Sequence, residues 1–511
     1  MEFRALVATA VAVTLFASAS AQAVGLDESD LADGSTPLHR AAFQGDVDEA
    51  QRLIKSGADV LATNAYGVNA MQLAADTANT DLIALLLKAG ADPQSPNADG
   101  ETALHLVARI GNVNAAKLLL KAGAKVDAIE SFGGQTPLMW AAARRHAAMV
   151  ELLASKGANV NARGAIRDYQ RVVTAESRAK SLDRGGFTPL LYAARENCRE
   201  CVEVLLKHKA DVNLGDPGEV SPLSVAMLNA NWDIAKRLIE AGADVNQWEL
   251  SGRSPLHVAI ANLQTANGRN PLDNDRPNTV TGRDVVKLLV ERGANPNQQQ
   301  YFGAPGGGGA QADRGLTPFL AAARTGDIEL VKLLLANGAD AHLATADGRG
   351  PILMSLTTRS SGRGVVGAGS PAAGTGSAQV ELVKLLAASG ADVNLMPKFH
   401  FLARTRGGSA LHYVVRDGGN PELIRTLLDL GFDINAKDGD GLTALDYAMG
   451  RGFVPFLQMP SPPNNALADR LRKLGANVEL DKMPEWPVLG TPVGTAVYDS
   501  VIWPLDSVVT R

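Results

Sequence analysis

The stretch DGSTPLHRAA at residues 33–42, followed by LIKSGAD at residues 53–59, recurs along the chain. With Thr36 as the anchor, ten equivalents follow, at Asn69, Thr102, Thr136, Thr188, Ser221, Ser254, Thr317, Gly350, Ser409 and Thr443. The base step, as from Thr36 to Asn69, is 33 residues, and three longer steps carry insertions. The chain is therefore predicted to consist of eleven copies of one unit.

The start of each unit has the pattern of a short helix. Proline after threonine suits the first helical position, because its missing N–H costs no hydrogen bond and its fixed φ favours the helix. Leu38, Ala41 and Ala42 lie three or four residues apart, on one face. The small alanines allow a neighbouring helix to approach closely.

A second helix follows in each unit. In the eighth unit its apolar stripe is predicted at Ile328, Val331, Leu334 and Leu335. Gly338 then ends the helix, because glycine adopts the left-handed cap conformation. One unit cannot bury both of its faces, so neighbouring units must cover each other.

The 33-residue spacing and the T-P-L-H-x-A block resemble the ankyrin repeat family, over about residues 30 to 480. The resemblance implies an all-α fold: a solenoid of paired antiparallel helices with hairpin-like fingers, in about eleven repeats. It also implies a non-enzymatic scaffold that binds another protein through its fingers and its first helices on the concave side. With the exported start described below, the sequence looks like an exported bacterial member of this family.

The repeats and insertions give a division of the chain. It comprises a signal peptide (1–23), repeats 1–4 (24–161), a finger insertion (162–184), repeats 5–7 (185–297), a Gly-rich finger insertion (298–313), repeats 8–11 with insertions (314–478) and a C-terminal capping tail (479–511). A third finger insertion covers about residues 395–405, and three others separate paired helices, at about 263–282, 357–378 and 452–464. The two sets are expected on opposite sides of the solenoid.

The first residues are typical of a secretory signal peptide. Arg4 gives a basic start, residues 5–16 form an apolar run, and Ala21-Gln22-Ala23 offers a small-x-small cleavage site. The alternative is an N-terminal helix of the folded protein. We expect export to the periplasm or beyond the cell, and no later stretch resembles a membrane span.

Composition limits the class of partner. Lys and Arg total 49 against 54 Asp and Glu, so no large positive field exists to attract nucleic acid. With only two cysteines, disulfides cannot hold so long a chain together, and packing must do so. We expect a monomer without a cofactor whose partner is another protein.

The finger insertions are the predicted partner-binding site. Aromatic and arginine side chains dominate binding hot spots because they bury large areas with few rotamers to freeze. The candidates are Arg167, Tyr169 and Arg171 in the first insertion, Tyr301 and Phe302 in the second, and Phe399 and Phe401 in the third. They would suit a partner with an acidic, partly apolar surface. The alternative is that these insertions are tolerated loops without a binding role.

Cys198 and Cys201 form a C-x-x-C pair. Alignment with other units places Cys201 at a leucine position of the second helix, as a small core residue. Cys198 falls at the start of that helix, where a thiolate is favoured. The pair is a candidate redox site or disulfide, and the sequence leaves open whether the two cysteines are joined.

No catalytic constellation is found. His39, His105, His257 and His412 occupy the same slot of four separate units, without further ligands at metal-binding spacing. The family resemblance implies that they tie each finger to its neighbour by hydrogen bonds. A nucleophile elbow, a Walker lysine and an H-E-x-x-H motif are all missing from the sequence.

The sequence therefore favours a non-enzymatic binding scaffold. The main alternative is a secreted effector or immunity-type inhibitor that blocks a foreign target, and a minor one is a thiol redox protein that uses Cys198 and Cys201.

Overall fold

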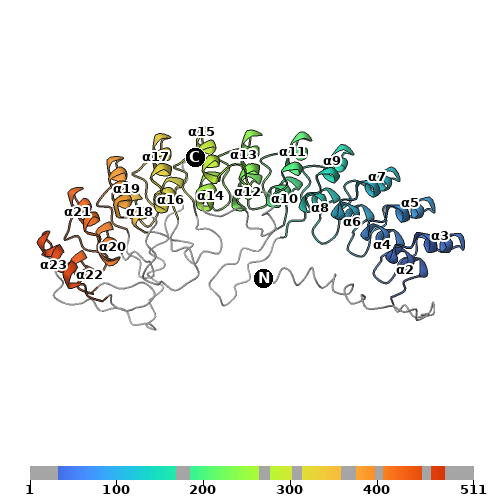
Figure 1. Cartoon of the computed structure of the whole chain (residues 1–511), viewed down its shortest axis with the longest axis horizontal. Helices are drawn as coiled ribbons and strands as arrows, with labels where there is room; N and C mark the ends of the chain where they lie inside the picture. Colours follow the sequence, from blue (N-terminus) through green and yellow to red (C-terminus); the bar gives the residue numbers. More distant parts are fainter. Residues whose placement is uncertain are drawn as a thin grey trace. The chain divides into compact units, whose positions relative to one another are not determined.

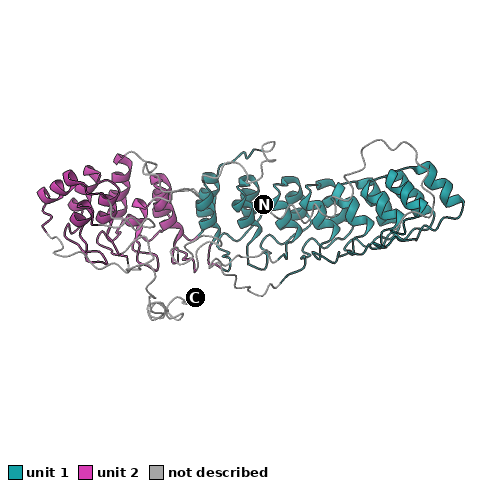
Figure 2. Ribbon diagram, turned by 90° about the horizontal axis from the view of Figure 1, so that it is seen from below, with its two compact units in different colours: residues 1–250, 254–294 teal, residues 251–253, 295–511 magenta. Residues whose placement is uncertain are grey.

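The computed structural model describes residues 33–167, 185–263, 277–301, 314–357, 376–397, 407–451 and 462–477. The chain divides into two compact units, coloured in Figure 2: unit 1 up to residue 294 without 251–253, and unit 2 with 251–253 and the residues from 295 onward. Within the described ranges the structure has 22 helices and no β-strand. The predicted signal peptide and capping tail lie outside these ranges.

Unit 1 holds seven helix pairs. Its first helices are α2 (Pro37–Gln44), α4 (Ala70–Asp76), α6 (Ala103–Ile110), α8 (Pro137–Ala143), α10 (Pro189–Arg195), α12 (Pro222–Leu228) and α14 (Pro255–Asn262). Its second helices are α3 (Val47–Lys55), α5 (Thr80–Lys88), α7 (Val113–Lys121), α9 (Ala147–Ser155), α11 (Arg199–Lys207), α13 (Trp232–Glu240) and α15 (Gly282–Glu291).

Unit 2 holds four helix pairs. Its first helices are α16 (Pro318–Thr325), α18 (Pro351–Leu356), α20 (Ala410–Arg416) and α22 (Ala444–Ala448). Its second helices are α17 (Ile328–Ala336), α19 (Gly376–Ala388), α21 (Pro421–Asp429) and α23 (Asn465–Lys473). The described part of the chain thus contains eleven pairs, as the repeat count predicts, and the all-α fold is confirmed.

Each predicted anchor residue is the N-cap of a first helix. Thr36 caps α2 and its side chain accepts a hydrogen bond from the His39 amide, with Pro37 at the first helical position. Gly350 is the exception, because it is the N-cap of α18 but has no side chain to accept a hydrogen bond. The anchor column therefore marks where the chain changes from extended to helical backbone.

Helices of the same kind pack in layers within each unit. Figure 1 shows the even-numbered first helices in one layer and the odd-numbered second helices in the other. Leu38, Ala41 and Ala42 in α2 are buried, as predicted, and α2 packs against α4 of the next repeat. The stripe predicted for α17 is partly wrong: Leu330 is buried, whereas Ile328 and Leu335 are only half-buried.

The repeated histidines tie fingers to first helices, as the resemblance implies. His39 Nδ1 accepts from the Thr36 amide at 3.0 Å, and Nε2 lies 3.0 Å from the Val68 carbonyl oxygen. Since a carbonyl can only accept, Nε2 carries the proton and the ring is neutral. Gln72 makes the same pair of bonds in repeat 2, accepting from the Asn69 amide and donating to the Glu101 carbonyl.

The interruptions of the repeat lie between helices. Residues 263–281 separate α14 from α15, residues 357–375 separate α18 from α19, and residues 449–464 separate α22 from α23. At the first finger insertion, Ile166 and Gly185 form an antiparallel bridge on either side of the undescribed residues 168–184. Among the described helices, none combines the length and hydropathy needed to cross a membrane.

Candidate functional site

The fourth and seventh residues after each N-cap lie on the same side of a first helix, because they are three residues apart. In unit 1 the fourth position is Trp140 in α8 and Tyr192 in α10, and the seventh is Arg109 in α6 and Arg195 in α10. We call these four residues the first-helix patch. They come from three consecutive repeats.

The patch consists of two arginine–aromatic pairs, one across the neighbouring helices α6 and α8 and one within α10. The Arg109 guanidinium lies 5.9 Å from the centroid of the Trp140 ring, and that of Arg195 lies 5.1 Å from the Tyr192 ring. All four residues are only partly buried, with Arg195 exposing 39% of its side chain. Aromatic rings with a stacked guanidinium offer a large, rigid and amphipathic contact area.

Buried neighbours hold the two aromatic rings in place. His105 meets the Trp140 ring edge-on, with centroids 5.4 Å apart. Gln135, in the finger between them, accepts from His105 Nε2 through its carbonyl and donates from its side chain to the Tyr192 hydroxyl at 2.6 Å. The finger therefore sets the geometry of the patch.

The carboxylates nearest the patch already have partners. Asp76 pairs with Arg109, and Glu196 pairs with Arg195 at 2.8 Å. Burial raises the pKa of the Glu101 carboxyl. Both carboxylate oxygens of Glu130 accept hydrogen bonds, from the backbone amides of Phe132, Gly133 and Gln135 in the finger.

Two donors of the patch differ from these satisfied groups. Arg109 Nε and Trp140 Nε1 are shielded from solvent and have no acceptor among the described residues. Such orphaned groups are rare in folded proteins and mark places that need an explanation, a missing water or partner being the usual one. Both atoms are shielded from solvent, so the donors open to a partner belong to the partly exposed side chains of Arg109 and Arg195, at 35% and 39% exposure.

The fingers of unit 1 carry most of its exposed large apolar side chains, namely Leu61, Tyr66, Ile129, Phe132, Ile166, Trp248 and Leu250. Phe132 is 74% exposed, and the Arg167 guanidinium lies 4.2 Å from its ring centroid while donating to its carbonyl oxygen. Exposed apolar groups gathered on one kind of element are typical of an interaction surface.

The structure brings few of the sequence-predicted binding residues together. Arg167 lies on Phe132 in unit 1, and Tyr301 is in unit 2, where its amide donates to the Ser251 carbonyl at 2.8 Å. The remaining candidates, Tyr169, Arg171, Phe302, Phe399 and Phe401, lie outside the described residues.

Sequence analysis missed the first-helix patch. The repeat alignment contained a signal for it, since the fourth and seventh positions after the anchor hold an aromatic or arginine residue in several repeats. The sequence-based prediction placed the binding residues in the finger insertions, which depart from the repeat.

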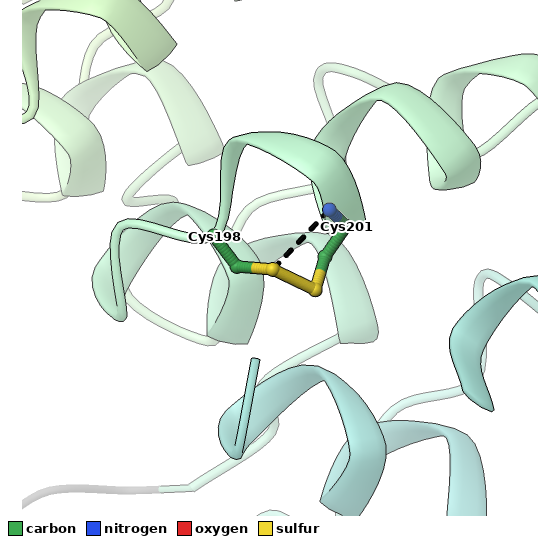
Figure 3. The surroundings of a disulfide bond; sticks show 2 residues. All are labelled: Cys198 and Cys201. Atoms are coloured by element: carbon green, nitrogen blue, oxygen red, sulfur yellow. Dashed lines mark hydrogen bonds between the residues drawn. A yellow bond between two sulfur atoms is a disulfide. The ribbon is translucent and has the colours of Figure 1, made fainter. Parts of the chain in front are cut away.

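Cys198 and Cys201 form a disulfide at the start of α11 (Figure 3). Neither cysteine exposes any surface, and Cys201 occupies a core position as predicted. A reactive pair needs an accessible sulfur, so this geometry favours a structural role over thiol exchange. Within the described ranges, no group of three His, Cys, Asp or Glu side chains is placed to hold a metal.

Models of one family match most of the repeat region. The description "Ankyrin repeats (3 copies)" matches residues 10–97 and 78–164, "Ankyrin repeats (many copies)" matches 400–448, and "Ankyrin repeat" matches 185–217, 251–301 and 314–346. Together these matches span more than half of the chain. The first begins at residue 10, inside the predicted signal peptide.

Individual relatives match parts of the chain. It is 30% identical over 192 residues to the B-cell lymphoma 3 protein homolog of Mus musculus, covering 37% of this chain and 36% of that protein. It is 23% identical to the E3 ubiquitin-protein ligase KEG of Arabidopsis thaliana, covering 45% of this chain and 14% of that one. This chain thus spans little more than a third of the mouse relative.

Among solved structures, the ankyrin repeat domain of Bcl-3, a member of the IkappaB protein family, is similar at 26% identity with a TM-score of 0.38. The match covers 50% of this chain and 99% of that domain.

Proposed function

Because this chain belongs to the ankyrin-repeat family, we propose that it is an exported, monomeric and non-enzymatic scaffold that binds another protein through the first-helix patch and the adjoining fingers of unit 1. The observation that carries the proposal is the patch itself: two half-buried aromatic rings, each with an arginine stacked on it. Such anchors make up most binding hot spots.

The chemistry of the patch indicates the kind of surface that it fits. Its carboxylates are engaged within the chain, while the side chains of Arg109 and Arg195 stay partly exposed, at 35% and 39%. A partner that supplies acceptor oxygens beside apolar side chains would complement it, in line with the acidic, partly apolar surface expected from the sequence.

Export rests on the signal-like residues 1–23, and the Cys198–Cys201 disulfide supports it, because disulfides persist in oxidising compartments. Sequencing the N-terminus of the mature protein tests this part: a cytosolic protein that still carries Met1 would contradict it. Recovery from the medium, and not from the cell envelope, would favour the secreted effector or inhibitor instead.

The binding face is tested by comparing variants as bait in the cell that exports the protein. Trp140→Ala should weaken the captured complex by about 2 to 4 kcal/mol of binding free energy. Arg195→Gln, at a more exposed position, should weaken it without disturbing the fold. The matched control is Lys117→Ala on the second helix α7, an exposed residue of the other layer.

Melting curves decide whether Trp140→Ala acts through binding or through the fold, since Trp140 also contacts His105. If Trp140→Ala and Arg195→Gln leave binding unchanged while Lys117→Ala reduces it, the proposed face is the wrong one.

A further inference from the structure

Six of the eleven second helices in the described ranges share one kind of N-cap, and α11 is among the other five. Asn or Asp side chains accept the third backbone amide of the helix at Asp46, Asn79, Asn112, Asp327, Asn420 and Asn464. In α11 the cap is Cys198, whose sulfur lies 3.2 Å from the Cys201 amide (Figure 3). Sulfur is a weak acceptor. The disulfide instead joins the cap and the third helical residue covalently.

Arg199, the first residue of α11, bonds to residues of the two following repeats. Arg199 Nη1 lies 2.7 Å from Asp233 Oδ2 in α13, and Arg199 Nη2 donates to the Pro277 carbonyl at 2.8 Å. Asp233 Oδ1 accepts from the Thr279 and Val280 amides at 2.9 and 3.0 Å. We call Arg199, Asp233 and residues 277–280 the latch.

The latch connects repeats that are not neighbours in sequence order. Arg199 is in repeat 5, Asp233 in repeat 6, and residues 277–280 lead into α15 of repeat 7. Asn278 adds a bond from its side chain to the Ala230 carbonyl at 2.8 Å. In a repeat stack each repeat normally contacts only its neighbours. The direct contact between repeats 5 and 7 therefore couples the unfolding of three repeats.

We propose that the Cys198–Cys201 disulfide replaces the usual Asn or Asp cap of α11 and thereby keeps Arg199 in place, so that closure of the latch depends on oxidation. Reduction by a dithiol breaks the S–S bond: two electrons and two protons convert the sulfurs to thiols, and the dithiol becomes a disulfide. The first turn of α11 is then left with only a weak cap. Because both sulfurs are fully buried, reduction requires that turn to open.

The repeat alignment supplies a matched pair of variants. Asn112 and Ala115 hold the equivalent positions in repeat 3, where Asn112 accepts from the Ala115 amide at 3.0 Å. The variant C198N/C201A therefore restores a polar cap without a disulfide, and C198A/C201A has neither. The two differ only at position 198.

Hydrogen exchange at the Thr279 and Val280 amides reports on the latch in the full chain. Protection there should fall about fivefold in C198A/C201A relative to the oxidised protein, the size expected for loss of one helix cap. It should return in C198N/C201A. Asp233→Ala, which removes the acceptor and leaves the disulfide intact, gives the value for an open latch.

Equal protection at these amides in all proteins except Asp233→Ala would overturn the link between disulfide and latch. Failure of C198N/C201A to restore protection would overturn the capping role. If C198A/C201A loses protection throughout the chain, the variant is misfolded. The comparison is then made on the unmodified protein, with and without dithiothreitol. Reduction must then lower protection at Thr279 and Val280 while leaving α5 in repeat 2 unchanged.

Discussion

The aromatic residues at the fourth position after the N-cap are used differently in the two units. In unit 1, Trp140 and Tyr192 are half-buried and support stacked arginines. In unit 2, Tyr413 and Tyr447 are buried. Arg416 lies 4.5 Å from the Tyr413 ring centroid, and the Tyr447 hydroxyl donates to Asp438 at 2.8 Å. The same position of the repeat thus forms an accessible patch in one unit and a closed polar network in the other.

The network in unit 2 explains why Tyr447 is not available for binding. Asp446 is fully buried, accepts from the Thr443 amide and hydroxyl, and lies 2.8 Å from Arg451 Nη1. Burial raises the pKa of Tyr447 and keeps its phenol protonated as a donor. Position in the repeat therefore determines where a side chain lies, while its neighbours decide whether it can meet a partner.

The largest predicted effect breaks the unit 2 network. Asp446→Ala removes the Arg451 ion pair and the capping-box acceptor of the Thr443 amide, so we expect a loss of about 3 kcal/mol or more in the free energy of unfolding of unit 2. Urea unfolding combined with hydrogen exchange in repeat 11 measures it.

Asp76→Ala in unit 1 is the matched control, because it also removes the carboxylate from an arginine. That pair is exposed, at 52% for the Asp76 side chain, so the expected loss is below about 1 kcal/mol. Equal losses in the two variants would mean that unit 2 is no more closed than unit 1.

A smaller effect separates the two tyrosines. Tyr447→Phe leaves a buried Asp438 oxygen short of one donor and should cost about 1 to 3 kcal/mol of stability. Tyr192→Phe loses the bond from Gln135 at a half-buried site and should cost below about 1 kcal/mol. Chemical denaturation of both variants tests the order, and a reversed order would contradict the assignment of open patch and closed network.

His105 and His412 should make both units lose stability at acidic pH. Burial lowers the pKa of His105 in unit 1 and of His412 in unit 2 below the ordinary value of 6.5. Below pH 6.5 the unfolded chain therefore binds protons that the folded chain excludes. Stability is fully present above that pH and falls by up to about 1.4 kcal/mol per pH unit for each histidine, until the folded ring itself protonates.

The control for this dependence is a histidine replaced by glutamine, because Gln72 makes the same contacts in repeat 2 without titrating. The double variant H105Q/H412Q should show a flatter decline of stability between pH 7.5 and pH 5. An unchanged slope would mean that other groups cause the acid sensitivity.

The repeat allowed most of the fold to be predicted. All eleven anchors are N-caps, because the need for an extended cap followed by a helix is local and visible in each copy. The buried stripe of α17 was partly misplaced, since the face that a helix buries depends on the angle at which its neighbours pack. The latch at residues 277–280 could not be predicted, because its partners lie one and two repeats away.

The candidate site was harder to predict from the sequence. Cys198 and Cys201 were identified, but whether they pair depends on the backbone geometry at the start of α11. Trp140 and Tyr192 had no sequence signal that separates them from Tyr413 and Tyr447, which hold the same position. Exposure, which decides their role, is set by the surrounding finger and by neighbours such as Asp438.

The smallest predicted effect compares the finger with the first-helix patch. Arg167 stacks on Phe132 and also donates to its carbonyl, so its guanidinium must give up contacts within the chain before it can meet a partner. An exposed cation–π contact is worth about 0.5 to 1 kcal/mol. Arg167→Ala should therefore change stability and partner binding by less than about 1 kcal/mol, against the larger loss expected for Trp140→Ala. Calorimetric titration of both variants against the captured partner decides between them. If Arg167→Ala costs more binding energy than Trp140→Ala, the finger insertion is the main anchor and the first-helix patch only supports it.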